Sequence, residues 1–281
     1  MTILVTTPTS KIGSALVSLL TEQGMDVRIG AHTIEKAQKL FPETEIVALD
    51  FSDAVSVKAA LDGADRLYLA PPREDFPVAP LLRTVDLAKA AGIKRIVFLS
   101  AMRVEDIETN IRQIERGTET SGIDFTHLRI NVLLQNYSTM SAEPIRAQGV
   151  FVEPVGDERT SFVDARDVAA VAAAALNEPG HAGQAYTLTG AVAHSRAEVA
   201  AAIAQATRKP IHYQSLSDEE FRALAQSLAW TDEFITMMLG FYHTHIRSGR
   251  SAIVTDTIER VLKRPPTSLT QFVQDYCNVW L

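Results

Sequence analysis

The chain has 281 residues, of which 46% are hydrophobic and 22% charged, and its formal net charge is −7 at pH 7. This acidic balance, with a pI near 5.5, argues against a nucleic-acid partner and against an anionic membrane surface. No apolar run approaches the ~20 residues that a membrane span needs, and the single cysteine, Cys277, excludes an intramolecular disulfide. We therefore expect a cytoplasmic globular protein, and no residue pattern indicates a metal centre.

The first half of the chain alternates short apolar runs with segments of helical periodicity. Six strands are expected, at 3–5, 26–30, 45–49, 66–69, 95–99 and 124–128. Helices are expected to follow the first five strands, near 12–20, from 32, near 53–61, near 78–91 and near 111–120. This alternation of near-continuous apolar strands with helices predicts a parallel sheet covered on both faces, that is, a Rossmann-like doubly wound α/β fold.

The pattern changes after Asn136. An alanine-rich helix ending at Leu176, a strand at 186–190 and a helix capped by Ser195 precede a mainly helical end. We expect a Rossmann-like domain over 1–153. A smaller, mainly helical C-terminal region over 154–281 is expected to complete the sheet and form the substrate pocket.

The turn after the first strand is the place where such a fold binds a dinucleotide. A G-x-x-G-x-x-G loop would place glycines at positions 7, 10 and 13, where this chain has Thr7, Ser10 and Gly13. A Cβ in a glycine-only conformation costs roughly 1–3 kcal/mol, although the hydroxyls of Ser10 and Thr9 offer compensating donors. The pyrophosphate site is expected at Thr7, Thr9, Ser10, Lys11 and Ile12. The alternative is a loop that keeps the fold and binds no dinucleotide.

Several segments occur in a specific order, at 93–100, 114–115, 121–129, 135–136, 161–169 and 186–190. Their order and spacing resemble the NmrA-like family of atypical short-chain dehydrogenases/reductases. The stretch from Pro265 to Ser268 and the helix after it also resemble the branch that contains festuclavine reductases. The family implies a domain that usually binds NADP(H), and its members include quinone, azo-dye, triphenylmethane-dye and iminium reductases as well as cofactor-sensing regulators.

The resemblance also implies positions for the cofactor. The further expected contacts are His32 and Lys36 at the 2′-phosphate, Asp50 and Phe51 on the adenine side, and Ala70, Pro71, Pro72, Ser100 and Ala101 beside the ribose and nicotinamide. His32 stands where family members often have arginine. Because no acidic residue ends the second strand to bind a ribose 2′-OH, NADP(H) is favoured over NAD(H).

No tyrosine is followed by lysine four residues later, so the Tyr-x-x-x-Lys pair of ordinary short-chain dehydrogenases is absent from the sequence. A reductase of this kind is expected to pass hydride directly to an electron-poor acceptor. Tyr137 is a candidate proton donor, or it packs in a core. Asn131 is a candidate contact to the nicotinamide or substrate, or it caps a turn. Arg112 stands where many members have lysine and cannot act as an acid.

The remaining histidines are expected to be structural. His127 on the sixth strand is expected in the core, and His243 and His245 are expected on the surface, on different faces of a helix.

Three functions follow. The first is an NAD(P)H-dependent oxidoreductase acting on a quinone-like, aromatic or polycyclic, or iminium small molecule. The second is a cofactor-independent descendant that catalyses a cyclisation or isomerisation in a biosynthetic pathway, indicated by the departures at Thr7, Ser10, His32 and Arg112. The third is an NADP-sensing regulatory protein. The sequence does not determine the oligomeric state, and a homodimer is one of the alternatives.

Overall fold

The structure is a computed structural model that describes residues 1–72, 76–106 and 108–281. Its contacts divide the chain into two interleaved units. Unit 1 comprises residues 1–130, 165–188 and 257–264, and unit 2 comprises residues 131–164, 189–256 and 265–281. The expected boundary at residues 153–154 lies inside unit 2, because the chain returns to unit 1 with α7 (Ala165–Asn177) and β8 (Gln184–Leu188).

Unit 1 is built on a seven-stranded sheet in the order β3-β2-β1-β4-β5-β6-β8, and every neighbouring pair is parallel. The first six strands are β1 (Thr2–Thr6), β2 (Asp26–Ala31), β3 (Glu45–Ala48), β4 (Arg66–Leu69), β5 (Arg95–Ala101) and β6 (Asp124–Ile130). The predicted Rossmann-like parallel sheet is therefore confirmed, with β8 as its seventh strand.

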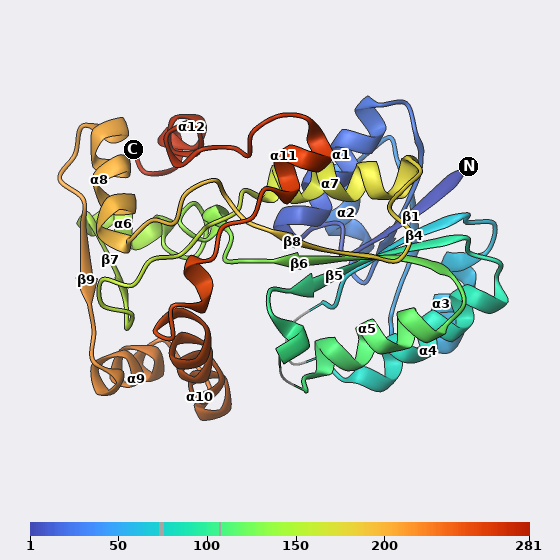
Figure 1. The fold of residues 1–281 in the computed structure, drawn as a ribbon, viewed down its shortest axis with the longest axis horizontal. Helices are drawn as coiled ribbons and strands as arrows, with labels where there is room; N and C mark the ends of the chain where they lie inside the picture. The colour runs from blue at the N-terminus through green and yellow to red at the C-terminus, as the bar shows by residue number, and fades with distance from the viewer. Residues whose placement is uncertain (73–75, 107) are drawn as a thin grey trace. The chain divides into compact units, whose positions relative to one another are not determined.

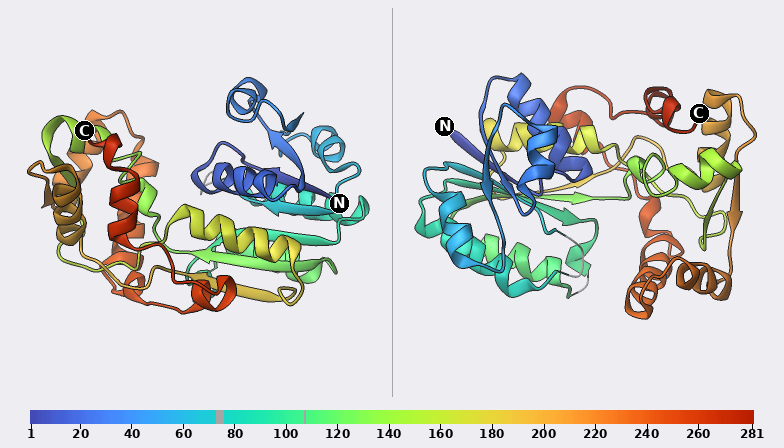
Figure 2. Two further views of the ribbon diagram at one scale, coloured as in Figure 1. Left: turned by 90° about the horizontal axis from the view of Figure 1, so that it is seen from above. Right: turned by 180° about the vertical axis from the view of Figure 1, so that it is seen from behind.

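Helices cover both faces of this sheet (Figure 1). One face carries α1 (Lys11–Glu22), α2 (Ile34–Leu40), α7 and α11 (Thr257–Leu262), and the other carries α3 (Ala54–Leu61), α4 (Val78–Ala90) and α5 (Asn110–Thr120). Seen from above, α1 and α7 lie side by side over the sheet (Figure 2). The small alanines of α7, which are buried, allow the helix to approach its neighbours closely.

Short polar residues begin the helices where the chain leaves a strand. The side chain of Ser10 accepts a hydrogen bond from Gly13 N at the start of α1, and Asp53 and Thr109 cap α3 and α5 in the same way. Gly92, at φ 81°, lies just past the end of α4 and adopts the left-handed conformation that glycine favours.

Unit 2 contains a two-stranded parallel sheet of β7 (Val150–Glu153) and β9 (His212–Ser215). Its α-helices are α6 (Ala142–Gln148), α8 (Arg196–Thr207), α9 (Asp218–Ser227), α10 (Asp232–Phe241) and α12 (Leu269–Asp275). Shorter turns are η2 (Leu134–Asn136), η3 (Tyr242–Ile246, a π-helix), η4 (Arg250–Ala252) and η5 (Cys277–Val279), and unit 1 has η1 (Val104–Asp106). Within the described ranges, every helix is too short or too polar to cross a membrane.

Candidate functional site

The loop between β1 and α1 keeps a glycine-type shape although two of the three glycines are absent. Gly13 is essential to that shape, since a Cβ built there would lie 2.2 Å from the carbonyl oxygen of Thr7. Ser10 is extended (φ −76°, ψ 164°), which any residue adopts, so a side chain there strains nothing. Thr7 has φ 49°, in the left-handed region that is uncommon for a β-branched residue. The missing glycine therefore strains the backbone only at position 7.

The same loop offers donors to an anion at the start of α1. Among the residues that the structure describes, the N–H groups of Thr9 and Ile12 donate to no protein atom. The hydroxyl of Thr7 is buried and has no hydrogen-bond partner in the described chain. Lys11 opens the helix, and partial burial lowers the pKa of its ammonium group. Backbone donors at a helix N-terminus are the arrangement that binds a pyrophosphate, so these residues fit a dinucleotide.

The other expected cofactor contacts follow the neighbouring strands of unit 1. His32 and Lys36 are exposed after β2, and Asp50, after β3, accepts a hydrogen bond from Ser52 N at 2.8 Å. Phe51 is buried and belongs to the apolar cluster on the α3–α4 side.

The next strands end in the same way. Ala70 is buried after β4, where its N–H donates to the hydroxyl of Thr6 at 3.0 Å, and Pro71 and Pro72 follow it. Ser100 and Ala101 end β5. Since the carboxyl ends of parallel strands meet at one edge, the sheet brings these candidates together at that edge.

A charged network lies beneath the end of β5. The carboxylate of Glu115, on α5, has no exposed surface and accepts hydrogen bonds from Ser100 (2.6 Å), Arg129 (2.9 Å to each oxygen) and Arg112 (2.8 Å). Burial would raise the pKa of this carboxyl, but the bonds from Arg129 and Ser100 outweigh it and hold the pKa below its usual range. Arg112 also pairs with Glu119 at 2.7 Å. The negative charges of Glu115 and Glu119 are thus balanced by the positive charges of Arg112 and Arg129.

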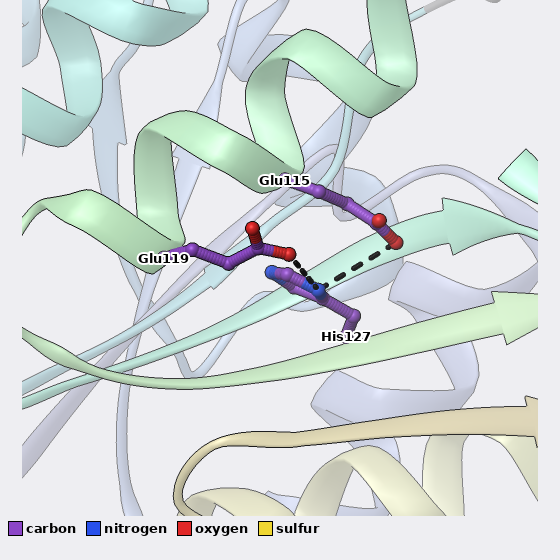
Figure 3. Close-up of side chains that lie close together, drawn as sticks. All are labelled: Glu115, Glu119 and His127. Atoms are coloured by element: carbon purple, nitrogen blue, oxygen red, sulfur yellow. Dashed lines mark ion pairs between the residues drawn. The ribbon is translucent and has the colours of Figure 1, made fainter. Parts of the chain in front are cut away.

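His127 projects from β6 into this network (Figure 3). Its side chain has no exposed surface, which confirms the expected core position. Nε2 lies 2.7 Å from the Thr118 hydroxyl, whereas Nδ1 has no hydrogen-bond partner in the described chain. Nδ1 lies 3.6 Å from Glu115 and 3.9 Å from Glu119.

These three side chains have the composition of a small metal site. A cation there would compete with two guanidinium groups that already occupy the carboxylate oxygens. The arrangement suits an ion-pair network rather than a metal.

The buried His127 predicts an acid-sensitive fold. Burial lowers the pKa of its imidazole from about 6.5 to about 4. Between these pH values the unfolded chain binds the extra proton and the folded chain does not, so stability falls as the pH is lowered through this window. The full loss is roughly 3 kcal/mol.

Urea denaturation at pH 7 and pH 4.5 measures this effect. His127→Gln should lose most of the pH dependence in the window, whereas His212→Gln, at an exposed position on β9, should keep it. Equal pH dependence in all three proteins would contradict the assignment.

Tyr137 lies in the core of unit 2. It has 1% of its surface exposed, and its ring contacts Phe151 and Phe162 edge-on. Its hydroxyl has no partner among the described residues, and burial, followed by the charge of Glu153, raises the pKa of the phenol well above its usual range. In this position the phenol is poorly suited to donate a proton.

Asn131 is also buried in unit 2, and its amide is fully engaged. Its Nδ2 donates to the Ser161 hydroxyl and to the carbonyl of Ser251, each at 2.8 Å. Its Oδ1 lies 2.9 Å from Val132 N and 3.1 Å from His245 Nε2. Asn131 is therefore better suited to hold neighbouring protein groups in place than to contact a ligand directly.

The ion pair between Glu115 and Arg129 was not predicted from the sequence. A signal was present, because Ile111, Ile114 and Thr118 define the buried face of α5 and Glu115 falls on it. A carboxylate at a buried helical position requires a charged partner.

Comparisons with known proteins find relatives that match nearly the whole chain. The sequence profile of the NmrA-like family matches residues 1–272. The chain is 30% identical over 278 residues to the NAD(P)H azoreductase of Xenophilus azovorans, covering 97% of this chain and 96% of that protein. It is 28% identical over 283 residues to quinone oxidoreductase 2 of Escherichia coli, covering 91% and 98%.

A solved structure of similar fold is the Citrobacter sp. triphenylmethane reductase complexed with NADP(H). Its TM-score is 0.84 at 21% identity, and the likeness covers 98% of this chain and 100% of that one. At that identity the likeness concerns the fold. Together with the match of the family profile over nearly the whole length, it leads to one conclusion: the chain belongs to the NmrA-like family.

Proposed function

We propose that this protein is an NADP(H)-dependent reductase that transfers hydride to an electron-poor small molecule. The observation that carries the proposal is the β1–α1 loop, in which Gly13 packs against the Thr7 carbonyl and the amides of Thr9 and Ile12 remain available. Relatives named as azo and quinone reductases support the same chemistry. When bound, the reduced nicotinamide supplies the hydride.

The chain's own residues have binding and positioning roles in this proposal. The start of α1 binds the pyrophosphate through backbone N–H groups. Ser100 must donate its hydroxyl proton to Glu115, since a carboxylate only accepts, so its oxygen remains an acceptor for a ribose hydroxyl or carboxamide N–H. Arg112 donates hydrogen bonds to Glu115 and Glu119. It therefore helps to fix the Glu115 carboxylate that binds Ser100, and it exchanges no proton.

The acceptor is proposed to be a quinone, an azo or triphenylmethane dye, or an iminium compound. These acceptors are electron-poor and take hydride without prior activation by an acid. The resemblances to azo and quinone reductases favour an aromatic compound.

The preference for NADP(H) is proposed to depend on Lys36. This exposed residue on α2 is near the end of β2, and residues 32–34 of that turn include no carboxylate to repel a 2′-phosphate. Lys36→Ala should raise the Kd of NADPH about tenfold and leave that of NADH within twofold, because only NADPH has the extra phosphate. Lys39→Ala, also exposed on α2, is the matched control and should change neither value.

Thermal shift and calorimetric titration with both nucleotides test the function itself. A nucleotide at a hundred times its Kd should add ~2.7 kcal/mol of stability. If millimolar NADPH and NADH both fail to bind, the reductase proposal is wrong. Product formation from a substrate without nucleotide would instead favour the cyclisation or isomerisation alternative.

A further inference from the structure

An arginine on α4 donates hydrogen bonds to the turn that follows β3, and no role described so far explains it. Nη2 of Arg83 lies 2.9 Å from the carbonyl oxygen of Phe51 and 2.8 Å from that of Ser52. In the part of the chain that the structure describes, the guanidinium of Arg83 pairs with no carboxylate. The hydrogen bonds of this exposed side chain therefore go to backbone carbonyls of one turn.

The turn is also fixed by contacts of its own. Phe51 is 6% exposed, and its ring meets that of Phe76 edge-on with the ring centres 5.9 Å apart. Asp53 N donates to the carbonyl of Asp50 at 3.0 Å, and the side chain of Asp53 caps α3. Successive carbonyls of an extended chain point to opposite sides. Here both carbonyls reach one nitrogen, so the backbone of the turn curls around the guanidinium of Arg83.

One peptide group carries the constraint from Arg83 to Asp50. The carbonyl of Phe51 and the N–H of Ser52 belong to the same planar peptide unit. Its oxygen accepts from Arg83, and its N–H donates to Asp50 Oδ1 at 2.8 Å. Because the unit is rigid, the hydrogen bond that fixes its oxygen also fixes the direction of the N–H that holds the carboxylate.

The carboxylate of Asp50 has one oxygen held and one available. Among the described residues, none donates a hydrogen bond to its second oxygen. An ionised carboxylate can only accept, so this oxygen selects a ligand group that donates. The strand order β3-β2-β1 places the turn on the far side of β2 from the proposed pyrophosphate site at the end of β1. Lys36, the proposed 2′-phosphate contact, follows β2, so the part of the nucleotide beyond the ribose reaches the turn after β3.

We propose that Arg83 is a positioning residue for the adenine base, because it orients the Asp50 carboxylate toward the exocyclic amino group. The inference rests on the proposed function, since it requires a bound dinucleotide with its adenine beside Asp50. The amino group of adenine can donate to the available oxygen of Asp50. Hypoxanthine has a carbonyl oxygen in the same place, and two acceptors repel each other. A carboxylate that is held in one orientation therefore selects adenine, whereas one that is free to rotate turns away from the wrong base.

The experiment compares NADPH with its deamino analogue, in which hypoxanthine replaces adenine. Calorimetric titration of the full chain gives the two Kd values. We expect the wild-type protein to bind NADPH about tenfold more tightly than the analogue, the equivalent of one hydrogen bond to a charged group. In Arg83→Ala the Kd of NADPH should rise about tenfold and that of the analogue should stay within about twofold, so that the preference for adenine disappears. Alanine favours the helix at this exposed position of α4, and thermal melting verifies that the variant folds.

Two further variants serve as controls. Lys89→Ala also removes an exposed positive charge from α4, and it should leave the ratio of the two Kd values unchanged. Asp50→Ala should abolish the preference for adenine. Adding Arg83→Ala to Asp50→Ala should not change the ratio further, since Arg83 is proposed to act through Asp50.

The other outcomes separate the inference from the function on which it rests. An equal rise of both Kd values in Arg83→Ala would overturn the inference, because it would indicate general support of the turn or simple charge attraction. A wild-type protein that binds both nucleotides equally well would also overturn it, and would leave the proposed function intact. A wild-type protein that binds neither nucleotide would refute the proposed function together with the inference.

Discussion

Gly13→Ala is expected to lower the affinity for NADPH by on the order of a hundredfold and to destabilise the fold by about 2 kcal/mol. The added Cβ would lie 2.2 Å from the Thr7 carbonyl oxygen and 2.9 Å from the Ser10 hydroxyl. The first of these is backbone, so the start of α1 must move away from β1. Movement of that helix end displaces the amides that are proposed to bind the pyrophosphate.

Calorimetric titration and urea denaturation measure the two effects. Gly240→Ala is the control, because this glycine lies inside α10 and a Cβ there meets no atom within 4 Å. It should raise stability by up to about 1 kcal/mol, since alanine is the better helix former, and leave NADPH binding unchanged. Unchanged affinity in Gly13→Ala would show that the loop does not hold the nucleotide.

The second large effect is expected from Glu115→Ala, which should cost roughly 3–5 kcal/mol of folding free energy. The substitution removes a fully buried carboxylate that pairs with both Arg129 and Arg112. Each guanidinium group therefore loses one of its ion pairs. It also releases the hydroxyl of Ser100, so NADPH binding should weaken in the variant that remains folded.

The exposed pair of Glu108 and Arg116 provides the comparison. These side chains are 52% and 56% exposed, and Glu108→Ala should cost less than about 1 kcal/mol. Chemical denaturation of both variants gives the difference. Similar small losses would mean that the buried network contributes little to stability.

The sequence predicted the large sheet well because its strands are apolar and buried on both faces. Val5, Leu67 and Ile96 belong to runs that cannot be placed elsewhere. The small sheet of unit 2 was not predicted, since His212–Ser215 is short, polar and largely exposed. Its pairing with β7 depends on a register that no periodicity reveals.

The site was predicted less completely than the fold. Candidate contacts at the end of a strand, such as Thr7 after β1 and Ser100 near the end of β5, can be proposed from the sheet alone. The partnership of Asn131 and His245 cannot, because these residues are 114 positions apart and meet only through a π-turn. Periodicity of 3.6 residues places neighbouring histidines correctly on an α-helix but not on a turn with an inserted residue.

The interleaving of the two units has a consequence for synthesis on the ribosome. When residue 130 has emerged from the exit tunnel, six strands of the large sheet are available, but α7 and β8 have not yet emerged. The nascent sheet then has an open edge at β6, and the parts of β4, β5 and β6 that α7 contacts in the finished protein are uncovered. Until residue 188 leaves the exit tunnel, this exposed edge and face should make the nascent chain more prone to aggregate than the finished protein.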